Sequence, residues 1–283
     1  MSITILPAMT RFEFTKMHGL GNDFVIVDGR AGRPPSVAQI RAMSDRRRGI
    51  GCDQFLTLRA PTDAGAAVRM DIHNPDGSVA EACGNGTRCV AALLMEESGA
   101  AAVTIETLAG HLDCRRADDG QIAVDMGPVQ LAAAEIPLAE DVDSAHVPLA
   151  DAPYSDACCV GVGNPHAVFF VADAEAVDLA AVGPRLETHP MFLARANIEF
   201  VAVVGRDHLR MRVWERAAGI TQACGSGACA SAVAAARRGL TGRAVTVDLD
   251  GGRLHITWRD DDHVIMAGPT ALSFSGVIDV PGG

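Results

Sequence analysis

Two cysteines occupy equivalent positions in a repeated five-residue segment. Ala82–Gly86 (Ala-Cys-Gly-Asn-Gly) recurs 141 residues later as Ala223–Gly227 (Ala-Cys-Gly-Ser-Gly), and each copy runs into an apolar, Ala-rich stretch typical of a helix. A cysteine directly before a helix lies close to backbone N–H groups at the positive end of the helix dipole. This position is expected to lower the pKa of Cys83 and of Cys224 and to raise their thiolate fractions.

The chemistry that suits two matched thiols is acid–base catalysis on both faces of one carbon. The glycines of each turn let the backbone approach a ligand closely, and N–H groups at a helix start can hold a carboxylate. One thiolate would remove the proton of a Cα–H bond, and the opposed thiol would deliver a proton to the other face. The N–H donors would stabilise the enolate-like charge that develops. The pattern therefore favours inversion at a Cα without a cofactor.

The repeat extends beyond the two cysteines. At an offset of 141, Val68–Asn74 matches Leu209–Glu215 and Gly127–Pro128 matches Gly268–Pro269. At an offset of 142, Gly19–Asn22 matches Gly161–Asn164 and Gly110–Leu112 matches Gly252–Leu254. Five matches in the same order indicate an internal duplication of half the chain, and the period is too long for a solenoid. We expect two similar domains.

Bulk properties agree with two globular domains and exclude several classes of protein. The chain has 283 residues, enough for two cores, and no apolar run of membrane-spanning length. Its net charge of −11 argues against nucleic acid and membrane partners. Residues 1–10 lack the basic start of a signal peptide and are expected to form an extension outside the core. We therefore expect a cytoplasmic protein whose eight cysteines are thiols.

Many short apolar runs predict strands, and few segments predict helices. The predicted helices are Val37–Asp45, Thr87–Glu97, Ala174–Val182 and Ala228–Arg238. The predicted strands are Phe24–Val27, Phe55–Leu58, Val68–Ile72, Val103–Thr107, Ile122–Val124, Ala167–Val171, Ile198–Val204, Leu209–Trp214, Val245–Leu249, Leu254–Trp258 and Val264–Met266. This mixture indicates an α+β fold, with each half a curved sheet around a central helix.

The domain boundaries follow from composition. We expect an N-terminal half over 11–130 and a C-terminal half over 131–270. The final strand, 271–283, is expected to pack with the N-terminal half. Residues 130–157 are acidic and contain three prolines, which is typical of a connection between domains.

Other readings of the cysteines are less favoured. Cys114, Cys158 and Cys159 are expected to be apolar packing residues, as are Cys89 and Cys229 inside the helices. A zinc site is not expected, because no Cys-x-x-Cys pair or His-x-x-x-His spacing occurs. A pyridoxal-phosphate racemase needs a Schiff-base lysine, and the chain has only one lysine, Lys16. A cysteine hydrolase would leave the second, symmetric cysteine without a role.

An ordered set of motifs resembles the diaminopimelate epimerase family from about Phe12 to Ile278. These motifs are Lys16–Phe24, Gly51–Gln54, Asn74–Ser78, Cys83–Arg88, Gly163–His166, Ala194–Phe200, Glu215–Arg216, Thr221–Gly227 and Gly268–Pro269. The resemblance implies two pseudo-symmetric domains, each with a helix inside a sheet barrel, and an active site in the cleft between them. It also implies interconversion of LL- and meso-diaminopimelate without a cofactor or metal, in lysine and peptidoglycan precursor synthesis.

The resemblance also implies a role for each matched residue. Cys83 and Cys224 are the acid–base pair, and His166 and Glu215 lie near the thiols, where they tune the thiol pKa. Arg216 suits the distal carboxylate, because its planar guanidinium can bind a carboxylate through two hydrogen bonds. The expected substrate-binding positions are Asn22, Gln54, Asn74, Gly84, Asn85, Asn164, Asn197, Glu215, Arg216, Gly225 and Ser226.

Five positions depart from the family pattern. Ala217 replaces a usual glycine and Ile220 replaces a usual carboxylate, so Ala217 is expected to be strained if its φ is positive. Phe274 stands where a tyrosine at the family's dimer interface is common, and we still expect a homodimer. Cys52 and His73 fall where the family more often has an aromatic, and they are expected to be packing changes.

Two alternatives stay open. One is a racemase of another amino acid, such as histidine, on the same scaffold. The other is a thiol hydrolase or a non-catalytic binding protein. The partner expected here is a small diamino-dicarboxylate.

Overall fold

The computed structural model describes residues 9–150, 152 and 154–282. Residues 1–8 of the predicted N-terminal extension, and Pro153 of the predicted connection, lie outside that part. The chain forms two compact units: unit 1 is Met1–Arg116 with Thr270–Gly283, and unit 2 is Ala117–Pro269. The contact-based division therefore lies at 116/117, whereas composition suggested 130/131. None of the described helices is both long and apolar enough to cross a membrane.

Unit 1 is a single mixed sheet. Its strands lie in the order β18, β1, β2, β3, β4, β6, β7, and the short β5 pairs with β4. The β2–β3 and β4–β6 pairs are parallel, and the other pairs are antiparallel. The bounds are β1 Met9–Gly19, β2 Asn22–Asp28, β3 Gln54–Arg59, β4 Val68–His73, β5 Val79–Ala80, β6 Ala102–Thr107, β7 Gly110–Arg116 and β18 Ala271–Pro281.

Unit 2 repeats this arrangement. Its strands lie in the order β9, β10, β11, β12, β13, β15, β16, β17, β8, and β14 pairs with β13. The β11–β12 and β13–β15 pairs are parallel. The bounds are β8 Ile122–Pro128, β9 Val147–Pro148, β10 Asp156–Gly161, β11 Pro165–Phe170, β12 Asn197–Gly205, β13 His208–Glu215, β14 Gly219–Ile220, β15 Ala244–Leu249, β16 Gly252–Trp258 and β17 His263–Gly268.

The two units share one topology. β1–β7 of unit 1 correspond in order and in pairing direction to β10–β16 of unit 2, with both parallel pairs at the same places. A parallel pair needs a crossover connection, and equivalent helices supply it in both units. These are α1 (Val37–Ser44) and α2 (Gly84–Ser98) in unit 1, and α3 (Leu179–Glu187) and α4 (Gly225–Arg237) in unit 2. The predicted α+β fold with two pseudo-symmetric halves is confirmed.

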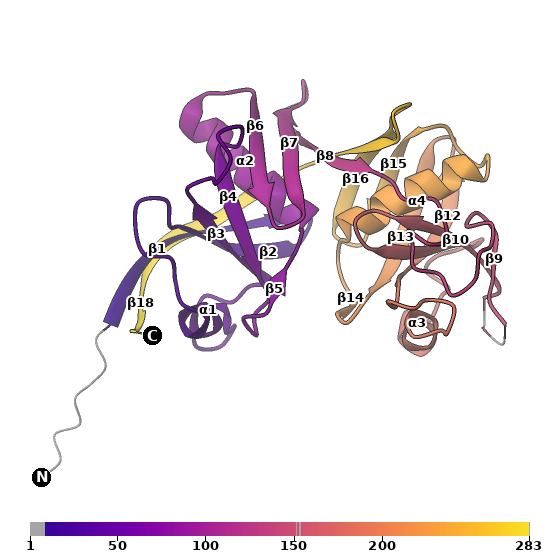
Figure 1. The fold of residues 1–283 in the computed structure, drawn as a ribbon, viewed down its shortest axis with the longest axis horizontal. Coiled ribbons are helices and arrows are strands. Elements are labelled where there is room, and N and C mark those ends of the chain that lie inside the picture. Colours follow the sequence, from indigo (N-terminus) through magenta and orange to yellow (C-terminus); the bar gives the residue numbers. More distant parts are fainter. Residues whose placement is uncertain (1–8, 151, 153, 283) are drawn as a thin grey trace, which may run out of the picture. The chain divides into compact units, whose positions relative to one another are not determined.

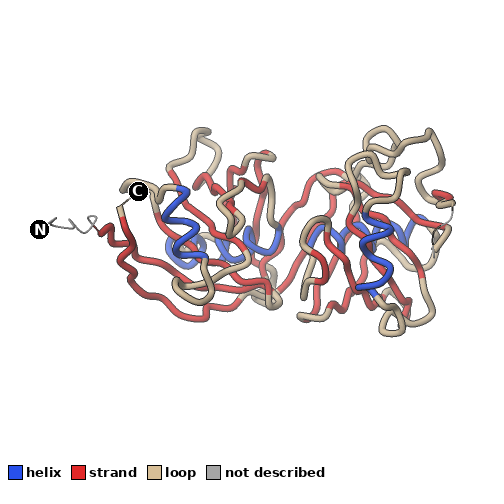
Figure 2. Tube along the Cα trace, turned by 90° about the horizontal axis from the view of Figure 1, so that it is seen from below, coloured by secondary structure: helices blue, strands red, loops and turns tan. Residues whose placement is uncertain are grey.

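A central helix lies against the strands of each unit (Figures 1 and 2). In unit 1, α2 packs on β1, β2, β6 and β7, and in unit 2, α4 packs on β10–β13 and β15–β17. A helix covered by strands over most of its surface needs small apolar side chains. The α4 sequence meets this need, because Ala228, Ala230 and Ala232–Ala235 are all buried.

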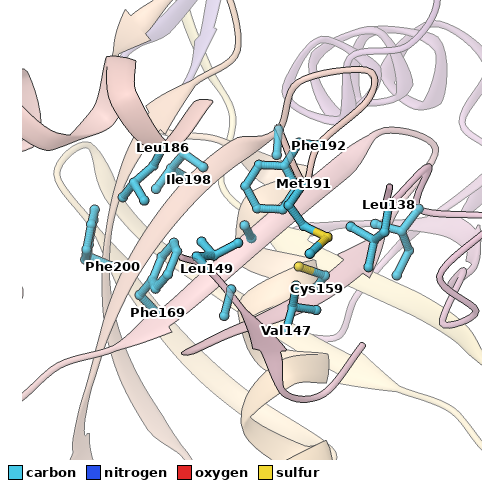
Figure 3. Packing of buried hydrophobic residues seen from close by; sticks show 14 of the residues in the cluster. Leu138, Val147, Leu149, Cys159, Phe169, Leu186, Met191, Phe192, Ile198 and Phe200 are labelled. Carbon is cyan, nitrogen blue, oxygen red and sulfur yellow. The ribbon is translucent and has the colours of Figure 1, made fainter. Parts of the chain in front are cut away.

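The second helix of each unit covers an outer apolar cluster. Ile40 and Met43 of α1 pack with Phe12, Val25 and Phe55. In unit 2, Leu186 of α3 lies in a larger cluster with Phe169, Ile198 and Phe200, shown in Figure 3. Both clusters bury the face of the sheet that the central helix does not cover.

Two predicted segments differ in the structure. The helix predicted over Ala174–Val182 is α3, which begins later because Asp178 caps it by accepting a hydrogen bond from Ala181 N at 3.2 Å. The predicted connection over 130–157 contributes Ile136, Leu138, Val147 and Leu149 to the core of unit 2. Its apolar residues are scattered among acidic ones, so the composition of the segment concealed its burial.

Candidate functional site

Cys83 is the N-cap residue of α2. Its backbone is extended (φ −154°, ψ 99°), and its Sγ accepts a hydrogen bond from Gly86 N at 3.3 Å. The side chain is partly exposed. The first N–H groups of a helix have no intrahelical acceptor, so the amides of Gly84 and Asn85 lie at the end of α2 where an anion binds favourably. The predicted cysteine position at the helix start is confirmed for this unit.

Asn22 and Asn85 lie together beside Cys83. Asn85 is buried and its Nδ2 donates to Asn22 Oδ1 at 3.3 Å, while Asn22 Nδ2 donates to Asp53 Oδ2 at 3.0 Å. The turn between β1 and β2 therefore meets the start of α2 through an amide–amide contact.

An ion-pair network holds this turn in place. Asp23 pairs with Lys16 at 2.5 Å and with Arg46 at 2.6 Å, and Arg46 also reaches Asp53 at 2.6 Å. Burial on its own raises the pKa of Asp23, but the hydrogen bonds from Arg46 and Lys16 outweigh it and hold that pKa well below its usual range. Lys16 is buried and also donates to the Gly51 carbonyl, so the only lysine of the chain has a structural role.

Gln54 and Asn74 complete the polar residues of unit 1. Gln54 Nε2 donates to Asn74 Oδ1 at 3.4 Å, and Asn74 Nδ2 donates to Ser78 Oγ at 3.0 Å. Both side chains are partly exposed. The structure thus gathers Asn22 with Asn85, and Gln54 with Asn74, within the unit that carries Cys83.

Cys224 is the N-cap residue of α4, in the same role as Cys83. Its Sγ accepts a hydrogen bond from Gly227 N at 3.4 Å and lies 3.6 Å from Ser226 Oγ. The lowered pKa expected at this position is wrong for Cys224. Burial, followed by the charges of Glu215 and Glu199, raises the pKa of this thiol well above its ordinary value, and the bonds from Ser226 and Gly227 offset this only in part. Burial and the two carboxylates therefore favour the thiol form of Cys224 over the thiolate.

His166 is fully buried and bonded at both ring nitrogens. Its Nδ1 lies 2.6 Å from Glu199 Oε1, and its Nε2 lies 2.8 Å from Asn164 Oδ1. Glu199 is also fully buried. The sequence placed His166 and Asn164 at the site but gave no role to Glu199, although Glu199 belongs to a matched motif. A carboxylate in the otherwise apolar run Ile198–Ala202 was the signal that could have singled it out.

Glu215 lies at the end of β13, at the position that Asn74 occupies in the other unit. Burial raises the pKa of Glu215 and the hydrogen bond from Thr221 Oγ1 opposes that effect; Cys224 is a further hydrogen-bonding neighbour. Glu215 and Cys224 are thus adjacent acidic groups. The charge of Glu215 raises the pKa of the Cys224 thiol, whereas the hydrogen bond with Cys224 lowers the pKa of Glu215.

Arg216 is exposed and is held by the loop before β12. Asn197 is buried, and its Oδ1 accepts from Arg216 N at 2.9 Å while its Nδ2 donates to Pro165 O at 3.0 Å. Arg216 Nη1 donates to Ala194 O at 3.1 Å. Asn197 therefore fixes the backbone that carries Arg216.

The Arg216 loop is strained and braced. Ala217 has a φ of 62°, which confirms the strain expected from the missing glycine. Buried Glu187 braces the loop, accepting from Ala217 N at 3.1 Å and from Trp214 Nε1 at 2.7 Å. Ile220 is exposed on β14 opposite Trp214.

The remaining cysteines are packed away from solvent. Cys114, Cys158 and Cys159 are buried as predicted, and so are Cys52, Cys89 and Cys229. Burial raises the pKa of Cys89 and of Cys114 to about 12.

Comparisons with known proteins agree with the fold and the motifs. The family model described as diaminopimelate epimerase matches residues 14–132 and 158–272, one segment in each half of the duplication. The chain is 58% identical over 264 residues to a diaminopimelate epimerase of Rhodospirillum centenum. This alignment covers 93% of this chain and 91% of that protein. It is 50% identical to a diaminopimelate epimerase of Phenylobacterium zucineum, and the alignment covers 93% of this chain and 96% of that protein.

Solved structures share the fold at low identity. A phenazine biosynthesis protein of the PhzF family from Bacillus anthracis has a TM-score of 0.68 at 15% identity, covering 95% of this chain and 99% of that one. A hydroxyproline epimerase of Agrobacterium vitis has a TM-score of 0.65 at 14% identity, covering 96% and 93%. The family model matches most of the chain, and the relatives are identical to it at half or more of the aligned positions. This chain therefore belongs to the diaminopimelate epimerase family.

Proposed function

We propose that this chain is a diaminopimelate epimerase that interconverts the LL and meso isomers without pyridoxal phosphate. The observation that carries the proposal is the pair of N-cap cysteines, Cys83 and Cys224, at equivalent positions of a duplicated fold. In the proposed reaction the two thiols act on opposite faces of one substrate carbon. Lys16, the only lysine, is committed to Asp23 and Gly51, which speaks against a Schiff base.

The proposed reaction moves one proton off the substrate and another onto it. One thiolate takes the Cα proton, and the electron pair of the broken C–H bond spreads onto the adjacent carboxylate. The opposite thiol then gives its proton to the other face of the carbon, so the first sulfur ends as a thiol and the second as a thiolate. When Cys83 acts as base, Cys224 is the proton donor, and the raised pKa of the Cys224 thiol favours that role.

Different polar residues bind the two ends of the substrate in the proposed complex. The amides of Gly84, Asn85, Gly225 and Ser226 hold the carboxylate at the reacting carbon, where enolate-like charge develops. Arg216, fixed by Asn197, binds the distal carboxylate. Substrate contacts by Asn22, Gln54, Asn74, Asn164, Asn197 and Glu215 complete the proposed set.

We further propose a homodimer in the cytoplasm. β18 has one strand neighbour among the described strands, β1, and it exposes Leu272, Phe274 and Val277. A strand edge with exposed apolar side chains favours a protein partner.

Isotope incorporation tests the proposed reaction. Incubating LL-diaminopimelate with the reduced protein in deuterated water should give the meso isomer with deuterium at the inverted carbon. Cys83→Ser and Cys224→Ser should each lower turnover at least about 100-fold, because each removes one of two acid–base groups. Cys114→Ser changes a buried cysteine outside the proposed site and should retain activity. Absence of deuterated product with the reduced wild-type protein would refute the proposal.

A second candidate is a racemase of another amino acid. Ala217 and exposed Ile220 flank the Arg216 loop and depart from the family pattern, so the distal end of the site is where substrate choice could differ. Screening single L-amino acids for deuterium at Cα distinguishes the two functions. A higher rate on one of them than on diaminopimelate would favour the racemase.

A further inference from the structure

The duplication allows the surroundings of the two thiols to be compared position by position. Phe24 on β2 corresponds to His166 on β11, at the offset of 142 residues. Phe24 lies opposite Gln54 in the sheet, and His166 lies opposite Asn197. Two residues further along each of these partner strands, Leu56 on β3 therefore corresponds to Glu199 on β12.

Side chains of the two units reach equivalent spots on their central helices. A Cβ added to Gly86 would lie 3.1 Å from Leu56 Cδ1, 3.4 Å from Phe24 Cε1 and 3.4 Å from Cys83 Sγ. A Cβ added to Gly227 would lie 2.8 Å from Glu199 Oε1 and 3.2 Å from Cys224 Sγ. The position beside the cap cysteine is thus lined by apolar side chains in unit 1 and by the carboxyl group of Glu199 in unit 2.

The scaffold does not need the ionisable pair of His166 and Glu199 in order to fold. Phe24 and Leu56 are completely buried in unit 1, and His166 and Glu199 are completely buried in unit 2. Burying a carboxylate costs several kcal/mol unless it is fully paired, and apolar replacements of buried pairs are often neutral or stabilising. Glu199 Oε2 has no hydrogen-bond partner in the described structure, so the pairing is incomplete. The pair therefore has a use other than stability.

The contacts indicate what that use is. The contact of 2.6 Å between Glu199 Oε1 and His166 Nδ1 fixes the imidazole ring and directs its Nε2 to Asn164 Oδ1. The titratable groups around Glu199 are His166 on β11, Cys159 on β10, Glu215 on β13 and Cys224 at the start of α4. In unit 1 the positions of His166, Glu199 and Glu215 are held by Phe24, Leu56 and Asn74, none of which carries a charge at neutral pH.

We propose that Glu199 is a positioning residue that holds His166, and that its carboxyl group lies beside Cys224 at a position that apolar Leu56 occupies beside Cys83. The two thiols of the duplicated fold are then chemically unequal. This inference rests on the proposed two-thiol function, and it adds a residue and an asymmetry to it.

A double-mutant cycle tests whether Glu199 acts through His166. His166→Phe and Glu199→Leu should each lower kcat about 100-fold with KM changed no more than a few-fold, because general acid–base groups contribute on this order. The double variant recreates the Phe–Leu pair of unit 1, so it should fold and melt cooperatively. Its activity should equal that of either single variant, because residues that act as one unit are not additive. Losses that multiply would overturn the proposal.

A second measurement does not depend on turnover. Iodoacetamide labelling at pH 8, followed by mass spectrometry, reports each thiol separately. Glu199→Gln removes a negative charge beside Cys224 and should speed labelling of Cys224 while labelling of Cys83 stays unchanged. Glu106→Gln, which neutralises a buried carboxylate of unit 1, should change neither rate. Equal changes at both thiols, or none at Cys224, would refute the proposal. Because labelling needs no substrate, it separates this failure from a failure of the epimerase assignment.

Discussion

Individual residues show how far side-chain chemistry depends on burial. Cys83 and Cys224 cap their helices in the same way, with Sγ accepting from Gly86 N and Gly227 N. The sequence predicted this capping, because a cysteine directly precedes each Gly-polar-Gly turn. It did not predict the raised pKa of Cys224, since that shift comes from burial and from Glu215 and Glu199, which belong to other strands. Glu199 was missed for the same reason.

Ala217 offers a stability test at the residue scale. An L-residue at a φ of 62° destabilises the folded state by about 1–2 kcal/mol, and glycine removes this strain. Glycine also makes the unfolded chain more flexible, which lowers the stability by about 0.5–1 kcal/mol. Ala217→Gly should therefore stabilise the protein by about 0.5–1 kcal/mol, measured by urea unfolding. The neighbouring Ala218 has no positive φ, so Ala218→Gly should destabilise by about 0.5–1 kcal/mol. A loss of stability in Ala217→Gly would contradict the strain.

Elements are placed by contacts that sequence patterns only partly contain. Strands β2, β3, β4 and β6 of unit 1 and the Ala-rich α4 were predicted because their apolar patterns are strong, whereas β7 was not among the predicted strands. The later start of α3 follows from its Asp178 cap, and the burial of Leu138, Val147 and Leu149 follows from packing against distant strands. The network of Lys16, Asp23, Arg46 and Asp53 also joins elements that are separate in sequence, and it carries the turn with Asn22.

Asp23 offers a test at the element scale. Asp23→Asn leaves buried Lys16 without its carboxylate and should destabilise the protein by about 3 kcal/mol at pH 7. Because the folded pKa of Asp23 lies below its unfolded value near 4, its contribution is present above about pH 4 and is lost as pH falls below it. Urea unfolding of both proteins from pH 7 to pH 3 should show the difference shrinking toward acid. A difference that is constant with pH would contradict this role of the ion pair.

The whole molecule shows the consequences of duplication. The repeated motifs predicted two related halves, and the shared topology of β1–β7 and β10–β16 confirms them. What distinguishes the halves are the residues at equivalent places: Phe24 against His166, Leu56 against Glu199, and Asn74 against Glu215.

The proposed dimer is tested at this scale. Light scattering on the eluting peak should give twice the chain mass of 29.5 kDa. Phe274→Glu puts a charge on the exposed apolar face of β18 and should shift the protein toward the monomer mass. Leu240→Glu changes a similarly exposed apolar residue of unit 2 and should leave the dimer intact. A wild-type protein that elutes at the monomer mass at all concentrations would rule out the dimer.

The sequence by itself determined the duplication, the family resemblance and the two cap cysteines, because these depend on residue types at fixed spacing along the chain. Only the tertiary structure decided that the pKa of Cys224 is raised, that Ala217 is strained and that Glu199 pairs with His166. Burial, backbone strain and electrostatic fields are sums over atoms from strands and loops that are far apart in sequence. That is why two nearly identical cysteine turns acquire different chemical surroundings.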